Sequence, residues 1–130
     1  METCLLYLGS RAAPFMSPPS LRQMAELFED AVRGAVEFFT EVDVEFSRSP
    51  RLLVANLRSG ESFVQVAVGD DVGFGEYFLV PISMGVISMG EMGSCELGRR
   101  LYSHMLANGG FYLMLEHEET GDVLASNVPG

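Results

Sequence analysis

A run of strand-like segments between Val42 and Val80 constrains the fold of this chain most strongly. Val42 to Phe46 alternates apolar and acidic side chains, which is the period-two pattern of a strand with one buried face. Strands joined by short reversals predict an antiparallel sheet, and Pro81 is expected to end the last strand of the run. Three more strands are predicted after Val42 to Phe46, over Leu52 to Leu57, Phe63 to Val68 and Phe74 to Val80. Turns rich in serine, glycine and aspartate separate these strands.

Two segments with helical periodicity flank this run. Ser20 and Gln23 have the S-x-x-Q spacing of a capping box, and the prolines before Ser20 stop a helix from extending backwards. A second helix is predicted from Gly93 or Ser94 to Asn108, because the glycines that follow tolerate the backbone of a helix end. The apolar stripe of the first helix follows the i, i+3, i+4, i+7 rhythm through Leu21, Met24, Phe28, Ala31, Val32, Ala35 and Phe39.

Strands are also predicted near both ends of the chain, over Cys4 to Leu8, Phe111 to His117 and Val123 to Val128. The order of elements is then roughly β-α-β-β-β-β-α-β-β. We therefore predict an α+β fold, with a mainly antiparallel sheet of about five to seven strands and two helices packed against one face. A chain of 130 residues is near the commonest domain size, so residues 1–130 are expected to form a single domain.

The charge balance limits the classes of partner. Eighteen acidic residues against eight basic ones give a formal net charge of -10. Binding to nucleic acid or to anionic lipid depends on many contacts from Lys and Arg, so we expect neither nucleic acid nor a membrane as a partner. The longest uncharged run, Tyr77 to Gly90, is far shorter than the ~20 apolar residues that span a bilayer.

The cysteines and the N-terminal segment bear on the cellular compartment. Cys4 and Cys95 lie far apart and belong to no CxxC or Cys/His cluster, so we expect reduced, inert thiols. The N-terminal segment lacks the charged start and the long apolar core of an export signal. We therefore expect a cytoplasmic protein.

No group of residues predicts catalysis, a cofactor or a metal site. His117 lies between Glu116 and Glu118, but adjacent residues of a strand point to opposite faces, so His117 does not share a site with either neighbour. His104 has no carboxylate in helical register. The loop from Gly69 to Gly75 joins two predicted strands, whereas a phosphate-binding loop joins a strand to a helix. We therefore expect no enzyme activity, no cofactor and no bound metal.

Acidic residues are concentrated along the first predicted helix and the strand after it. A solvated charged face is the ordinary explanation for such a region. The sharper hypothesis is electrostatic steering toward a basic partner protein, with these carboxylates as the binding surface. The acidic residues concerned are Glu26, Glu29, Asp30, Glu37, Glu41, Asp43 and Glu45.

A second candidate surface is the Met-rich segment after Pro81, in which Met84, Ile87, Met89 and Met92 lie among glycines. Methionine is flexible and polarizable, so the segment suits a groove that adapts to a partner. The alternative is a connection that faces the core. The motif ISMG occurs twice at a five-residue spacing, which matches neither helix nor strand, so we predict no regular element there.

Size, acidity and the lack of a catalytic motif favour a non-enzymatic protein that inhibits or neutralises a basic partner. The immunity protein of a bacterial toxin and a phage-encoded inhibitor are examples of this class. One alternative is a small acidic chaperone of a secreted effector, which is expected to form a homodimer. Another is a small-molecule-binding or enzymatic α+β domain with a pocket beside Met84 and Tyr77. The sequence leaves these alternatives open.

Overall fold

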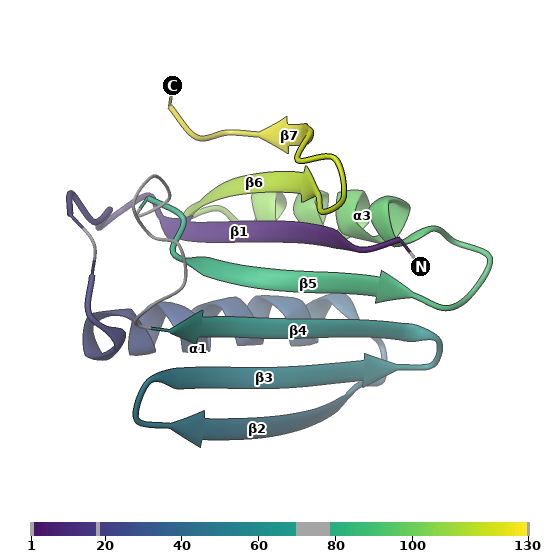
Figure 1. Cartoon of the computed structure of the whole chain (residues 1–130), viewed down its shortest axis with the longest axis horizontal. Coiled ribbons are helices and arrows are strands. Elements are labelled where there is room, and N and C mark those ends of the chain that lie inside the picture. The colour runs from purple at the N-terminus through teal and green to yellow at the C-terminus, as the bar shows by residue number, and fades with distance from the viewer. Residues whose placement is uncertain (1, 18, 70–78, 130) are drawn as a thin grey trace.

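One antiparallel sheet organises the molecule (Figure 1). The computed structural model describes residues 2–17, 19–69 and 79–129. Within these ranges seven strands pair in the order β2-β3-β4-β5-β1-β6-β7, and each neighbouring pair is antiparallel. The strands are β1 (Cys4–Ser10), β2 (Asp43–Ser49), β3 (Leu52–Ser59), β4 (Ser62–Gly69), β5 (Ile82–Ser88), β6 (Phe111–His117) and β7 (Val123–Ser126).

The two helices of the described residues, α1 (Leu21–Phe38) and α3 (Ser94–Asn108), lie on the same face of the sheet, which we call the inner face (Figure 1). α1 packs on β3, β4, β5 and β1, and α3 packs on β5, β1 and β6. The predicted α+β class and the order β-α-β-β-β-β-α-β-β are confirmed. Neither helix in the described ranges is long and apolar enough to cross a membrane.

Local sequence signals set the start of α1 and both ends of α3 as predicted. Ser20 caps α1, because its side chain accepts a hydrogen bond from the amide of Gln23 and the Gln23 side chain accepts one from the amide of Ser20. α3 begins after Gly93 and ends at Asn108. The next residue, Gly109, has a φ of 71°, a backbone conformation that glycine adopts without strain.

The Ser20→Ala variant is expected to lower the free energy of unfolding by about 1 kcal/mol, because an amide in the first turn of α1 loses its acceptor. Chemical denaturation followed by circular dichroism measures the change. Ser17→Ala, in the exposed loop before the helix, is the matched control and should cost less than about 0.5 kcal/mol. An equal loss in the two variants would contradict the role of the cap.

The core lies between the inner face of the sheet and the apolar sides of the helices. Leu6 of β1 lies opposite both Met84 of β5 and Leu115 of β6, and these three side chains are fully buried. Leu21 and Phe39, at the two ends of the predicted stripe of α1, are only half buried. The buried residues of α1 are Met24, Leu27, Phe28, Ala31, Val32, Gly34 and Ala35.

The segment after Pro81 is a central strand, which corrects two expectations. β5 lies between β4 and β1, and its alternate residues face the core. The strand predicted over Phe74 to Val80 falls largely outside the described residues, and Leu79 and Val80 lie in a turn. Pro81 therefore precedes a strand instead of ending one, a position where its missing N–H does not interrupt the ladder.

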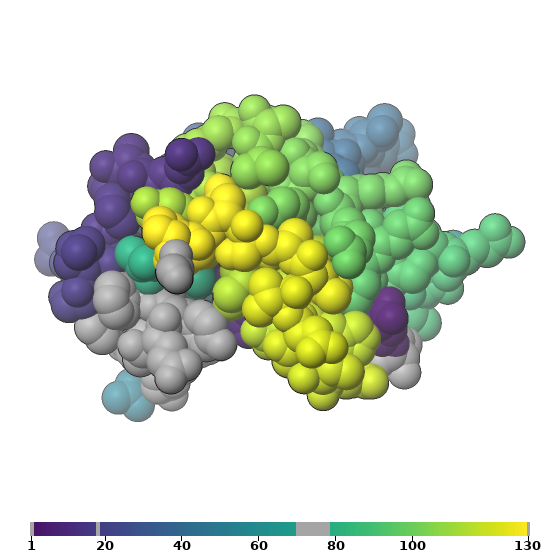
Figure 2. Space-filling model, turned by 90° about the horizontal axis from the view of Figure 1, so that it is seen from above, coloured from purple at the N-terminus to yellow at the C-terminus, as the bar shows by residue number. Residues whose placement is uncertain are grey.

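β2 and β7 form the two edges of the sheet. Seen from above the β7 edge (Figure 2), the C-terminal residues in yellow lie across this end of the molecule beside α3 in green. β2 lies at the opposite edge (Figure 1), and all seven of its residues are exposed. Among the described residues β2, with seven residues against four in β7, presents the longer free edge.

Candidate functional site

An apolar groove lies between α1 and the edge strand β2, and we call it the α1–β2 groove. Val44 and Phe46 point to the inner face, because they pair with the core residues Leu57 and Ala55 of β3. The helix leaves them uncovered, so Val44 is 37% exposed and Phe46 is 65% exposed. Large apolar side chains that face a groove and stay exposed are typical of a binding surface.

Two adjoining hollows, of about 640 and 490 Å³, make up the groove. Both touch Ala25 of α1, Leu53 of β3 and Arg48 of β2, so they form one continuous depression along the strand. It has room for several apolar side chains of a partner. The remaining apolar lining comes from Leu21, Phe28, Val32, Phe46, Pro50 and Val54, and the charged lining from Arg22, Glu29, Arg33 and Arg48.

The acidic residues predicted as a partner surface lie on two sides of the sheet. The acidic residues of α1 and of the turn after it lie on the helical side of the sheet, where arginine residues lie between them. Asp30 is half buried and forms an ion pair with Arg33, with 3.1 Å between Oδ1 and Nη1. The exposed members of this group are Glu26, Glu29, Glu37 and Glu41.

Asp43 and Glu45 of β2 point away from the helices, because they alternate with the inward-facing residues of that strand. Asp43 lies opposite Arg58 of β3, whereas Glu45 lies opposite Asn56, which is neutral. The sheet separates these two carboxylates from those of α1. The seven acidic residues therefore do not form one patch: Glu29 lines the α1–β2 groove, whereas Asp30 and Glu37 line another hollow, beside Asn108.

The Met-rich candidate surface is divided between the core and the solvent. Met84 is fully buried, so its side chain is not available to a partner, and Met92 is half buried against the core. Met89 is 63% exposed, and Ile87 lies half buried on the face turned away from the helices. Tyr77, which was expected beside the pocket, lies outside the described residues. Ile87 and Met89 line an open hollow of about 500 Å³ with Arg58, Gly60, Glu61, Ser62 and Phe63.

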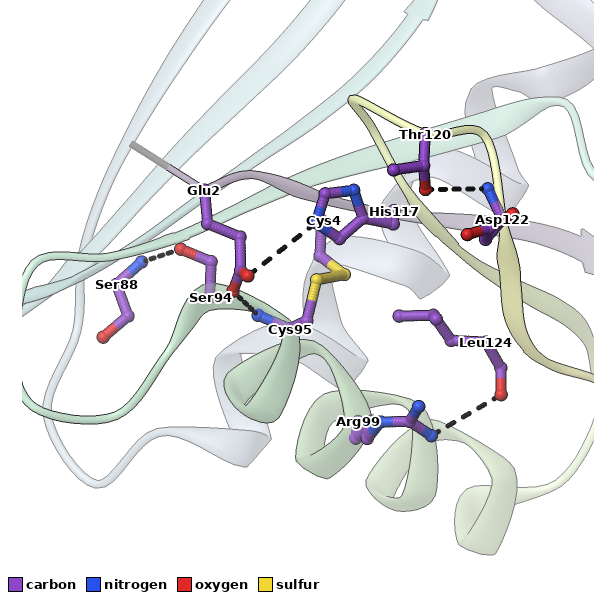
Figure 3. Close-up of a disulfide and its surroundings, with 10 residues drawn as sticks. All are labelled: Glu2, Cys4, Ser88, Ser94, Cys95, Arg99, His117, Thr120, Asp122 and Leu124. Carbon is purple, nitrogen blue, oxygen red and sulfur yellow. Dashed lines mark hydrogen bonds and ion pairs between the residues drawn. A yellow bond between two sulfur atoms is a disulfide. The ribbon is translucent and has the colours of Figure 1, made fainter.

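A disulfide joins β1 to α3 (Figure 3). Cys4 is buried on β1 and Cys95 lies in the first turn of α3, with 5.2 Å between their Cα atoms. The expectation of reduced, inert thiols is therefore wrong. The helix approaches the strand this closely because Gly98 has no side chain, and a Cβ atom there would lie 3.3 Å from Cβ of Cys4.

Glu2 and His117 lie beside this bond, and with the two cysteines they form what we call the disulfide cluster (Figure 3). His117 is the cross-strand partner of Cys4, and its Nε2 lies 3.7 Å from Oε2 of Glu2. Oε1 of Glu2 accepts a hydrogen bond of 3.0 Å from the amide of Cys95. Glu116, the neighbour of His117 in the sequence, faces the other side of the sheet. No local motif marks the cluster, because its members come from three distant parts of the chain.

His104 links the two helices. Its Nε2 lies 3.1 Å from the carbonyl oxygen of Gly34, and its ring packs edge-on against Phe38 with 5.5 Å between centroids. On the same helix, burial raises the pKa of Tyr102 above the ordinary value of a phenol, so its hydroxyl stays neutral. The contacts of His104 with Gly34 and Phe38 give it a structural role between α1 and α3.

No protein-family model and no curated protein matches the sequence, and no solved structure matches the fold. The side chains of the α1–β2 groove and of the disulfide cluster are therefore the observations that bear on function.

Proposed function

We propose that this chain is a non-enzymatic binding protein that inhibits or neutralises a basic partner protein in the cytoplasm, in the manner of a toxin-immunity protein or a phage-encoded inhibitor. The α1–β2 groove is the observation that carries the proposal. It combines a free edge strand, an exposed aromatic side chain and carboxylates on both sides of that strand. A long, uncovered edge presents unpaired N–H and C=O groups, which are a template for another strand.

An extended segment of the partner can pair with β2 by strand addition, in which main-chain hydrogen bonds supply affinity and alternate side chains supply specificity. On the inner side, the side chains of such a segment meet Val44 and Phe46 and enter the groove beside Phe28. On the other side they meet Asp43 and Glu45. The segment that fits β2 best therefore alternates apolar and basic residues.

The charged lining of the groove itself is mostly arginine, so the support for a basic partner comes from the carboxylates on the other side of β2 and from the net charge. Glu45 lies opposite the neutral Asn56, so its carboxylate is available to a cation on an added strand. An oppositely charged cross-strand pair contributes roughly 0.2–1 kcal/mol. Over longer distances the net charge of -10 steers a cationic partner toward the protein and raises the association rate.

Phe46→Ala is expected to weaken the complex roughly 30-fold, because truncating a central aromatic anchor costs on the order of 2 kcal/mol. Glu45→Lys should mainly slow association, and wild-type association should slow as salt is added. The immobilised chain first captures its partner from a lysate of the source cells. Binding rates with the purified partner are then measured by surface plasmon resonance.

Val123→Ala and Glu118→Lys are the matched controls, because both residues are exposed and lie near the opposite edge of the sheet. They should bind the partner as the wild type does. The proposal fails if the captured protein is not basic, or if all four variants bind alike.

A dimeric chaperone of a secreted effector is the second candidate, because the β2 edge is complementary to itself. When two copies of β2 pair antiparallel about Phe46, the two phenylalanines lie side by side, Val44 lies opposite Arg48, and Glu45 lies opposite Ser47. No like charges meet in this pairing. Sedimentation equilibrium separates the candidates: a dimer that Phe46→Ala dissociates favours the chaperone, and a monomer at micromolar concentration favours the inhibitor.

A further inference from the structure

We propose that reduction of the Cys4–Cys95 bond turns the disulfide cluster into a binding site for a single zinc ion, with Cys4, Cys95, His117 and Glu2 as ligands. The set offers two thiolates, an imidazole and a carboxylate. Zn²⁺ binds these donors in tetrahedral sites, and such mixed sets suit its borderline-soft character. The inference concerns a different part of the molecule from the α1–β2 groove and does not depend on it.

Three of the four donors already lie close together. One ligand atom from each of Glu2, Cys95 and His117 falls within 4.8 Å of the others, and Cys4 is bonded to Cys95. Bonds to zinc of about 2.0–2.3 Å place neighbouring ligand atoms roughly 3.3–3.8 Å apart. Once the sulfur atoms separate, small side-chain rotations are therefore enough to close the site.

The backbone holds these residues before any metal binds. Cys4 lies on a central strand beside His117, its cross-strand partner. Glu2 accepts a hydrogen bond from the amide of Cys95, which fixes its carboxylate over the start of α3 (Figure 3). Arg99, the cation drawn nearby, points instead to the carbonyl oxygen of Leu124 at 3.5 Å (Figure 3). A site organised on a strand and a helix end needs little reorganisation to bind an ion.

His117 directs one ring nitrogen toward the carboxylate of the cluster. Its Nδ1 is buried and has no hydrogen-bond partner within the described part of the chain, and its Nε2 faces the carboxylate of Glu2 at 3.7 Å. Here Nε2 is directed toward an anion beside two sulfur atoms, which is the environment of a metal ligand.

The chemistry is a reversible exchange of one cross-link for another. A thiol or phosphine reductant supplies two electrons, and with two protons the S–S bond becomes two thiols. Zn²⁺ then displaces both thiol protons, since thiolates are the species that bind it. The disulfide ties β1 to α3 under oxidising conditions, and the metal ties the same two elements under the reducing conditions of a cytoplasm.

The test is a metal titration of the full chain, reduced with a phosphine under nitrogen and compared with the oxidised chain. Co²⁺ is added first as a spectroscopic probe, followed by Zn²⁺. We expect one ion per reduced chain, a sulfur-to-cobalt charge-transfer band, tetrahedral visible bands, and displacement of cobalt by zinc. The oxidised chain should bind neither ion. Zinc should also raise the melting temperature of the reduced chain and leave that of the oxidised chain unchanged.

Variants assign the ligands. Glu2→Gln and His117→Ala should each weaken zinc binding by at least about tenfold. Removing a residue that only hydrogen-bonds to a metal ligand already costs about this much, and these two residues are proposed as ligands themselves. Glu118→Gln and His104→Ala are the matched controls and should bind as the wild type does. Glu2 is exposed, so its variant is expected to fold normally. Absence of binding to the reduced wild type, or wild-type affinity in both Glu2→Gln and His117→Ala, overturns the proposal.

Discussion

Replacing Cys4 and Cys95 together by alanine is expected to lower the free energy of unfolding by about 3 kcal/mol and the melting temperature by roughly 10 °C. The disulfide spans a sequence separation of 91 residues, so its loss returns much conformational freedom to the unfolded chain. In the folded state it ties a central strand to the first turn of α3. Calorimetry of oxidised protein in a buffer that contains a metal chelator measures the loss.

The single variants supply the control for this prediction. Cys4→Ala and Cys95→Ala each remove the same bond, so each should cost nearly as much as the double variant, and the two losses should not add. Wild-type protein reduced in the presence of the chelator should melt close to the double variant. Additive losses, or a wild type that is insensitive to reduction, would mean that the bond does not contribute to stability in solution.

The disulfide cluster illustrates what the sequence does not reveal. Cys4 and Cys95 meet because β1 is inserted between β5 and β6, and α3 crosses the inner face beside it. The same insertion places His117 opposite Cys4. This neighbourhood follows from the order of strands in the sheet, and strand order depends on long-range pairing that no local spacing encodes. Residues far apart in the chain therefore give no motif for a metal or for a disulfide.

Features that depend on a few neighbouring residues were predictable. The Ser20 and Gln23 capping box, the start of α3 after Gly93 and its end at Asn108 follow from capping chemistry within one turn. Alternation in the segment after Val42 identified β2 as a strand. The same alternation determined which residues share a face, but the sequence did not indicate that α1 leaves the inner side of β2 uncovered.

β5 was missed because its alternation is hidden by small residues. Ile82, Met84 and Val86 face the core, whereas Ser83 and Gly85 occupy two of the intervening positions on the other face. Serine and glycine have low strand propensity, so the segment appeared irregular. Pairing with β4 on one side and β1 on the other overrides that local preference. The position of the strand is set by its neighbours in the sheet.

Met84→Ala is expected to lower the free energy of unfolding by about 3 kcal/mol, because Met84 is fully buried and its truncation leaves a cavity in the centre of the sheet. The side chain lies opposite Leu6 on one side and Val66 on the other, and neighbouring side chains relax only partly into such a cavity. Urea denaturation followed by circular dichroism measures the loss. Met84→Leu keeps most of the volume and should cost less than about 1.5 kcal/mol.

Met89→Ala is the matched comparison, with the same chemical change at a residue that is 63% exposed. It should alter stability by less than about 0.5 kcal/mol. A larger loss of stability in Met84→Ala than in Met89→Ala would show that Met84 packs in the core, whereas Met89 remains free to contact a partner. A large loss at Met89 would contradict this division, because a side chain exposed to water in the folded chain has few packing contacts to lose. A negligible loss at Met84 would contradict the central position of β5 itself.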